Sequence, residues 1–401
     1  MIVLGIETSC DETSLALVEA SGGLNNPRFR VLKNLVSSQI KIHAPFGGVV
    51  PNLAKREHTK NLPILLRKIL RISKQIPIIK SQTPKIDMVA VTVGPGLEPA
   101  LWTGITFAQA LTAELRRPDA DRRGKKPLLV GANHLEGHLY SFLLESKPKN
   151  LTLNASAKGG SASGGKTSTL FPAISLIVSG GHTILLFVKD LAHWKKLGET
   201  RDDAVGEAFD KVARLLELPY PGGPALEKLA LSLPKGRKPS IIFPRPMLNQ
   251  KNYDFSFSGL KTAVLYFLRN AEQRGQLRHE KLPLIARGAD ADRRGKSQRL
   301  SASAADIAAS FQTAALDVLV AKATRAAREF GAKSIMLSGG VAANKALRKA
   351  LQREAKKLGV AFLAPEAEYN TDNAAMIAVA GYMTHLRKKR HPLRANGSLN
   401  I

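Results

Sequence analysis

The sequence of 401 residues contains a single cysteine, Cys10, so no disulfide can form within the chain. A chain without disulfides is typical of a reducing compartment, and we expect a cytoplasmic protein. Apolar runs are also short, because none reaches the roughly 20 residues that a membrane-spanning helix needs. Since Met1 leads directly into the apolar residues 2–6, we expect no signal peptide. These absences argue against a disulfide-framed secreted domain and predict no membrane segment.

Acidic residues are scarce relative to basic ones, with 32 Asp and Glu against 60 Lys and Arg and a net charge of +28. Such an excess favours a polyanionic partner, usually RNA or DNA. The alternative is that basic insertions merely solvate loops. Two segments, 116–126 and 287–299, contribute +7, which leaves +21 on the rest of the chain. We therefore expect contact with nucleic acid.

Short apolar runs alternate with segments of helical periodicity, which indicates an α/β layer architecture. The length allows two domains with proper cores. We expect strands at 2–8, 14–18, 28–36, 86–93, 128–130, 173–178, 184–189, 334–337 and 361–364. We expect helices at 57–71, 99–116, from 134 onward, 204–216, 225–233, 302–330, 344–357 and 372–388.

Two kinds of segment interrupt this pattern. Residues 147–169 are rich in Gly, Ser, Ala and Lys and have too little apolar content to pack, so we expect a flexible surface insertion. The sequence Asp-Ala-Asp-Arg-Arg-Gly-Lys occurs twice, at 119–125 and 290–296. A repeat this short and isolated is no solenoid unit, and we interpret both copies as mobile loops.

Two histidines four residues apart, His134 and His138, occur in the sequence Asn-His-Leu-Glu-Gly-His. On a helix they project from one face about one turn, roughly 5.4 Å, apart. Neutral imidazoles so placed can hold a divalent ion if a third ligand arrives from elsewhere, and the best distant candidate is Asp372. The alternative is a pair of surface histidines or a helix cap. The pattern is not the zinc-protease HExxH, because Glu136 stands third and not second.

Three glycine turns lie at 179–182, 221–224 and 338–341, each after a strand or before a helix. Without a Cβ, the backbone can approach phosphate or ribose closely and direct its N–H groups at it. A single Gly-Gly after a strand is most often only a tight turn. Two strand-Ser-Gly-Gly elements and a third Gly-Gly turn in one chain favour a nucleotide held between two related halves.

Carboxylates gather in two further segments. Residues 7–13, Glu-Thr-Ser-Cys-Asp-Glu-Thr, form a polar turn that can accept a proton or bind phosphate. The alternative is a plain polar turn without such a role. At the start of the helix expected from 204, Asp202 and Asp203 could contact ribose hydroxyls or cap that helix.

The chain resembles a known family through seven motifs that stand in the family's order. These are GIETSCDET (5–13), HLEGH (134–138), VSGGHT (178–183), GEAFDK (206–211), YPGGP (220–224), FSFSGLK (255–261) and SGGVAAN (338–344). The chain is similar to the bacterial and organellar branch of the tRNA N6-adenosine threonylcarbamoyltransferases, from residue 2 to about residue 386.

This resemblance implies an α/β fold of the actin/Hsp70/sugar-kinase-like (ASKHA) type, with the site in the cleft between two RNase-H-like domains. We expect residues 1–130 plus 373–401 to form the first domain and 131–372 the second. The second would contain the flexible insertion near 147–169 and a basic linker near 287–300. The insertion, the repeated loops and the basic tail 387–390 depart from the family pattern and leave loop contacts and partner surfaces open.

The resemblance also implies a reaction, in which threonylcarbamoyl moves from threonylcarbamoyl-AMP to N6 of adenosine 37 in tRNAs that read codons beginning with A. Carried over by motif, His134, His138 and Asp372 would bind one divalent metal, usually iron and sometimes zinc. Asp11 would be an active-site carboxylate. The adenylate would be held by Ile177, Val178, Ser179, Gly180, Gly181, Asp210, Gly223 and Asn344.

The implied partners are tRNA, a paralogous subunit, a small P-loop ATPase and a separate synthase that supplies the intermediate. The alternatives are an ATP-hydrolysing member of the same superfold and a non-catalytic tRNA-binding paralogue. The histidine pair argues against the first, since such enzymes use Mg²⁺ with oxygen ligands. The second would be expected to lose a residue of the metal set, and all three are present.

Overall fold

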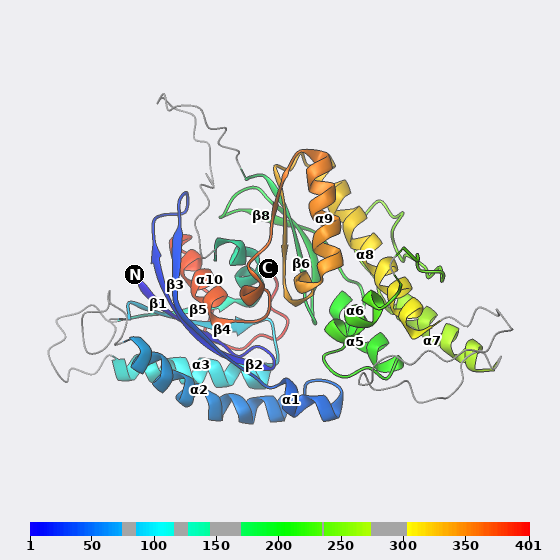
Figure 1. Cartoon of the computed structure of the whole chain (residues 1–401). Coiled ribbons are helices and arrows are strands. Elements are labelled where there is room, and N and C mark those ends of the chain that lie inside the picture. Colours follow the sequence, from blue (N-terminus) through cyan, green and yellow to red (C-terminus); the bar gives the residue numbers. More distant parts are fainter. Residues whose placement is uncertain (74–85, 116–126, 145–169, 235, 274–302) are drawn as a thin grey trace.

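The computed structural model describes residues 1–73, 86–115, 127–144, 170–234, 236–273 and 303–401. Two five-stranded sheets form its framework (Figure 1). The first sheet has the order β3-β2-β1-β4-β5 and consists of β1 (Ile2–Glu7), β2 (Glu12–Ser21), β3 (Arg28–Ser38), β4 (Met88–Gly94) and β5 (Leu128–Asn133). The second has the order β10-β9-β6-β7-β8 and consists of β6 (Ala173–Val178), β7 (Thr183–Val188), β8 (Trp194–Glu199), β9 (Ser334–Ser338) and β10 (Ala361–Leu363).

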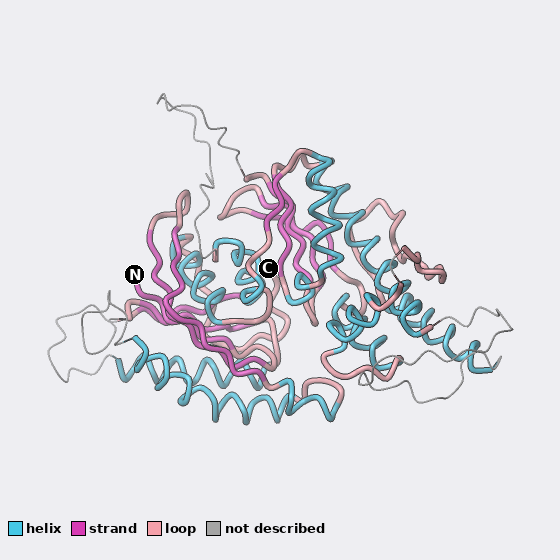
Figure 2. Tube along the Cα trace, viewed as in Figure 1, coloured by secondary structure: helices cyan, strands magenta, loops and turns pink. Residues whose placement is uncertain are grey.

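The two sheets repeat one topology. In the first, β1–β2 and β2–β3 are antiparallel while β1–β4 and β4–β5 are parallel. In the second, β6–β7 and β7–β8 are antiparallel while β6–β9 and β9–β10 are parallel. Each half is therefore a meander of three strands extended by two parallel strands, and Figure 2 shows the two sheets side by side.

Helices cover the outer faces. The helices α1 (Ile40–His43), α2 (Pro51–Ser73) and α3 (Glu98–Leu115) belong to the first half, where buried residues of α2 and α3 form a core with β1, β2 and β4. The second half contains α5 (Val205–Leu215), α6 (Gly222–Leu231), α7 (Ser258–Gln273), α8 (Ala304–Glu329) and α9 (Lys345–Leu358), which share a core with β6, β7 and β9.

A third core joins the halves. It contains residues of β1, β2 and β4, residues of β6 and β7, and two helices that lie between the sheets, α4 (His134–Tyr140) and α10 (Ala374–Leu386). Eleven of the 13 residues of α10 are buried, which explains why its sequence is apolar all round. The last helix of the chain thus packs on the sheet formed by the first strands.

One helix of the described residues, α8, is long and apolar enough to cross a membrane by length and composition. This helix contains charged residues, among them Asp306, Asp317 and Lys322, so it is not an unbroken apolar run. Of its most apolar window, 67% is buried inside the structure, as in the core helix of a folded domain.

Most expected elements are present, with shifted ends. The strand at 173–178 has the expected bounds, whereas α2 begins at Pro51 and not at residue 57. The expected turn at 221–224 is in part helical, because Gly222 begins α6. The sequence did not predict β8 or α7. The insertion at 147–169, both Asp-Ala-Asp-Arg-Arg-Gly-Lys segments and the linker near 287–300 lie outside the described residues.

Candidate metal and substrate site

The histidine pair lies on α4, whose start is fixed by its N-cap. The side-chain oxygen of Asn133 accepts hydrogen bonds from the backbone N–H groups of Leu135, at 2.8 Å, and Glu136, at 3.4 Å, as N-cap residues do. The rings of His134 and His138 come from one face of this helix and their centroids lie 4.7 Å apart. Both side chains are buried.

Asp372 reaches the pair from the loop before α10. The next residue, Asn373, caps α10 by accepting from the N–H of Met376 at 3.0 Å, which fixes the loop relative to the helix. One carboxylate oxygen of Asp372 lies 3.2 Å from His138 Nε2 and 3.5 Å from His134 Nε2. The three ligand atoms lie within 4.8 Å of one another. The structure therefore brings together the three residues that the sequence singled out.

The Asp372 carboxylate attracts a cation or a proton at the cluster. Burial lowers the pKa of His134, but the charges of Asp372 and Glu7 raise it by more, to about 9, so a bound metal would displace the proton of this ring. Burial alone raises the pKa of Asp372, but the neighbouring His134 and His138 lower it by more, so its carboxylate stays ionised. Burial also lowers the pKa of His138, so its ring is neutral and available as a ligand. Both ring nitrogens of His138 are buried, and among the described residues neither makes a hydrogen bond of regular geometry, although the Asp372 oxygen lies 3.2 Å from Nε2. A divalent ion is the kind of group that satisfies such a nitrogen.

A second carboxylate, Glu7, orients the first histidine. Its Oε2 lies 3.0 Å from His134 Nδ1 and accepts from the hydroxyl of Thr92 at 2.8 Å. Glu7 is fully buried at the end of β1. A carboxylate behind a metal-ligating histidine fixes the ring and raises its basicity, and Glu7 leaves Nε2 directed at Asp372. The sequence indicates Glu7 only as part of the polar turn 7–13, because its contact with His134 joins residues 127 positions apart.

The turn between β1 and β2 presents Asp11 beside this cluster. Asp11 is 7% exposed. Burial raises the pKa of Glu12, together with the charges of Asp11 and Asp372. Burial, with Asp11 and Asp210 contributing, also raises the pKa of Tyr220. The charge of Asp11 therefore acts both on Glu12 beside it and on Tyr220, which precedes the second glycine turn.

The first glycine turn, between β6 and β7, lies next to the histidines. The Ser179 hydroxyl accepts from the N–H of His182 at 3.1 Å, which closes the turn. Burial, His134 and His138 lower the pKa of His182 to about 4. A Cβ built at Gly180 or Gly181 would meet open space. The backbone of this turn therefore leaves room for a ligand, whereas the side chains of Ile177 and Val178 at the end of β6 are fully buried in the hydrophobic cores.

The third glycine turn packs against the end of β6, and the second is attached to α5. Gly339 has φ +90°, and a Cβ there would lie 2.3 Å from the carbonyl oxygen of Val178, so only glycine allows β9 to end this close to β6. Gly223 has open space around it and donates its N–H to Asp210 Oδ1 at 3.1 Å. Asn344 caps α9 by accepting from Leu347 N–H at 2.9 Å.

Asp202 and Asp203 have a different role from the ones expected. Asp202 Oδ1 accepts from the N–H groups of Phe257 and Ser258, at 2.8 and 3.2 Å, and so caps α7. Asp203 forms ion pairs with Lys211 at 2.7 Å and Lys261 at 3.0 Å. The alternative that they cap the helix beginning near 204 is wrong, because Val205, the first residue of α5, donates its N–H to the Thr183 hydroxyl at 2.9 Å and both carboxylates have other partners. Both carboxylates are engaged within the protein, which disfavours ribose contacts.

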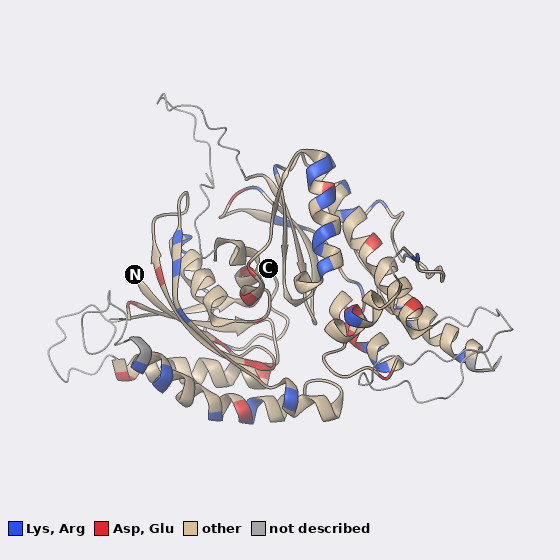
Figure 3. Cartoon of the chain, viewed as in Figure 1, with Lys and Arg blue, Asp and Glu red and all other residues tan. Residues whose placement is uncertain are grey.

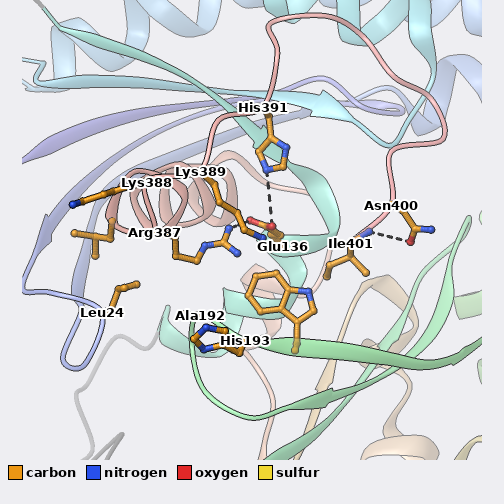
Figure 4. Close-up of a pocket in the computed structure, with 12 residues that line it drawn as sticks. Leu24, Glu136, Ala192, His193, Arg387, Lys388, Lys389, His391, Asn400 and Ile401 are labelled. Atoms are coloured by element: carbon orange, nitrogen blue, oxygen red, sulfur yellow. Dashed lines mark hydrogen bonds and ion pairs between the residues drawn. The ribbon is translucent and has the colours of Figure 1, made fainter.

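The back of α4 carries Glu136, the third residue of the histidine motif. Its carboxylate forms a buried ion pair with Arg387, and both side chains are 3% exposed. Arg387 and His391 turn toward Glu136 (Figure 4). These three residues and Trp194 line a cavity of about 660 Å³. The guanidinium carbon of Arg387 lies 4.6 Å from the centroid of the Trp194 ring.

Comparison with known proteins agrees with this geometry. A family model described as tRNA N6-adenosine threonylcarbamoyltransferase matches residues 30–166 and 152–379. Relatives of that name from Thermosipho africanus and Moorella thermoacetica are 42% and 41% identical, over 95% and 98% of this chain and 94% and 95% of their own. Another from Bacillus thuringiensis is 40% identical over 99% of this chain and 95% of its own.

Solved structures with little sequence similarity share the fold. A crystal structure of HypF from T. kodakarensis is 15% identical, covers 96% of this chain and 48% of its own, and superposes with a TM-score of 0.52. The matches to the three named relatives span nearly the full length of this chain and of each relative. The chain therefore belongs to the tRNA N6-adenosine threonylcarbamoyltransferase family.

Proposed function

We propose that this acyltransferase moves the threonylcarbamoyl group from threonylcarbamoyl-AMP to N6 of adenosine 37 in tRNAs that read codons beginning with A. The observation that carries this proposal is the convergence of His134, His138 and Asp372, with three ligand atoms within 4.8 Å, beside the Asp11 turn. A carbamoyl-phosphate anhydride is already activated, so the enzyme mainly positions N6 and stabilises developing charge.

His134, His138 and Asp372 would hold one divalent metal per subunit. Two histidines and one carboxylate are the donor set of non-haem Fe²⁺ sites and are also compatible with Zn²⁺, and we favour Fe²⁺. When bound, the metal would supply Lewis-acid polarisation of the carbamoyl oxygen.

The residues on the glycine turns would bind the adenylate. The backbone N–H groups at Gly180 and Gly181 lie where a side chain would find open space, which suits contact with phosphate oxygens. Residues 177–179 would form the same wall. Asp210, held by the N–H of Gly223, and Asn344 would line the opposite side.

Asp11 would accept the proton that N6 loses during transfer. Direct transfer is favoured over a covalent intermediate because burial and the charge of Asp11 raise the pKa of the neighbouring Cys10 thiol well above its usual value. A protonated thiol is a poor nucleophile. In this step the carbamoyl carbon exchanges its bond to the phosphate oxygen for a bond to N6. The enzyme then releases AMP and the tRNA that contains the modified adenosine.

The repeated sheet topology supports two RNase-H-like domains of an ASKHA fold, with boundaries at 1–130 plus 373–401 and 131–372 and the site in the cleft between them. We place the protein in the cytoplasm. A paralogous subunit, a small P-loop ATPase and a synthase that supplies threonylcarbamoyl-AMP would act with it.

A basic face of α9 would contact the tRNA backbone. Five exposed cations follow one side of this helix (Figure 3), namely Lys345, Lys349, Arg353, Lys356 and Lys357. The helix begins immediately after Asn344, so its cations from Lys345 to Lys357 span about 18 Å along the helix that leads away from the proposed adenylate site. Neutralised phosphates would contribute salt-dependent affinity.

The test is single-turnover transfer from threonylcarbamoyl-AMP to an unmodified tRNA, with and without partner subunits, followed by nucleoside mass spectrometry. We expect the wild type to form the modified adenosine. His138→Ala and Asp372→Ala should lose both the metal and the product while tRNA binding persists. Normal modification by both variants would refute the metal-assisted mechanism, and tRNA binding without any modification would indicate a non-catalytic paralogue.

A further inference from the structure

Three consecutive carbonyls hold the turn that carries Asp11. The carbonyl oxygens of residues 9, 10 and 11 accept, in that order, from Leu97 N–H at 2.8 Å, His58 Nε2 at 3.0 Å and Gln39 N–H at 2.9 Å. The outer two donors are backbone amides, whereas the central donor is a side chain of α2. The backbone on both sides of the Asp11 side chain is thereby attached to three separate segments.

The hydrogens of the His58 ring can be assigned from its partners. A carbonyl oxygen only accepts, so Nε2 carries the hydrogen that bonds to Cys10 and Nδ1 of the neutral ring accepts. The hydroxyl of Thr13 lies 2.8 Å from Nδ1 and the side-chain amide nitrogen of Gln39 lies 3.2 Å from it. The ring is fully buried, and burial lowers the pKa of His58, so the neutral form persists near neutral pH.

A second histidine extends this arrangement and fixes its direction. The backbone N–H of Val50, which precedes α2, donates to His43 Nδ1 at 3.3 Å. His43 therefore carries its hydrogen on Nε2, which lies 3.1 Å from Gln39 Oε1. The oxygen of the Gln39 amide must then face His43 and the nitrogen must face His58. Every donor points the same way, from Val50 to the Cys10 carbonyl.

We propose that His58 is a positioning residue for the transfer reaction, because it fixes the Asp11 turn through the Cys10 carbonyl. This inference rests on the proposed function, in which Asp11 accepts the proton from N6. His58 itself is buried behind the turn and acts only through it. A displacement of about 1 Å at a reacting group costs on the order of 10²-fold in rate, so loss of this one donor is expected to be visible in kcat.

Two substitutions distinguish the acceptor role of His58 Nδ1 from the donor role of Nε2. In His58→Asn the amide oxygen can replace Nδ1 as acceptor, but no donor reaches Cys10. In His58→Gln the longer side chain places its amide nitrogen near the position of Nε2 and restores the donor. Thr112→Val is the control, since this buried hydroxyl bonds only to the Ala108 carbonyl within α3 and does not touch the turn.

We expect His58→Asn to lower kcat on the order of 10²-fold with KM for tRNA unchanged, while His58→Gln and Thr112→Val remain close to wild type. Amide hydrogen exchange of residues 9–13, measured without substrate, should accelerate in His58→Asn alone. Equal loss in His58→Asn and His58→Gln, or no loss in either, would overturn the positioning role. An inactive wild type would refute the proposed function, and the exchange data would then still decide whether His58 holds the turn.

Discussion

The buried ion pair behind the histidine helix makes the sharpest stability prediction. Glu136 and Arg387 are each 3% exposed, so Glu136→Ala would leave the Arg387 guanidinium in the protein interior without its carboxylate. Removing one partner of a buried pair costs about 3–5 kcal/mol, whereas replacing both by neutral residues of similar volume is often nearly neutral. We therefore expect Glu136→Ala to be far more destabilising than the double variant Glu136→Gln/Arg387→Met.

The assay can use a reporter next to the pair. Trp194 lies against Arg387, and the chain has only one other tryptophan, Trp102. In a Trp102→Phe background, urea unfolding followed by fluorescence would report on Trp194 alone. We expect a coupling free energy of about 2–3 kcal/mol between the two positions in a double-mutant cycle. The reasoning would be refuted if Glu136→Ala lowered the free energy of unfolding by less than about 1 kcal/mol. It would also be refuted if the losses of the two single variants simply added up to that of the double variant.

Three further predictions concern the metal site, the basic face of α9 and the cap of α7. Glu7→Gln should weaken binding of the metal at His134 by about 10–100-fold, measured by calorimetry; an unchanged affinity would contradict the role of Glu7. Lys349→Glu and Lys356→Glu should each reduce the salt slope of tRNA binding by about 1, whereas an unchanged slope would place the tRNA elsewhere. Asp202→Ala should cost about 1 kcal/mol at pH 7 through the lost cap of α7. Burial raises the pKa of Asp202, but its hydrogen bonds from Ser256 and Ser258 lower it by more. The stability that this carboxylate contributes is therefore lost as pH falls below about 4. An equal cost of Asp202→Ala at pH 7 and at pH 3 would contradict this role of the carboxylate.

The sequence predicted the elements whose patterns are local. Buried strands such as β6 are continuous apolar runs, and the spacing of His134 and His138 was enough to place both rings on one face. It missed β8, because Trp194–Glu199 has only two apolar side chains and three charged ones and becomes a strand by pairing with β7.

Interactions between distant segments account for the other omissions. Asp202 was expected to serve the helix that follows it, but it caps a helix that begins 56 residues later. His58 gave no signal either, because its role depends on a carbonyl 48 residues away. Such partners are set by the packing of whole elements, and a pattern within a window of 10 to 20 residues does not contain them.

The position of α10 has a consequence for biosynthesis. This helix completes the core under β1 and β2, and the N–H of Ala374 donates to the hydroxyl of Ser14, 360 residues earlier. At about 5–20 residues per second, a ribosome needs roughly 20–70 s to connect these two residues. During that interval the first strands lack their covering helix, and the second sheet is completed only when β10 has been made, shortly before α10. The half made earlier therefore needs protection from aggregation until the last helix emerges.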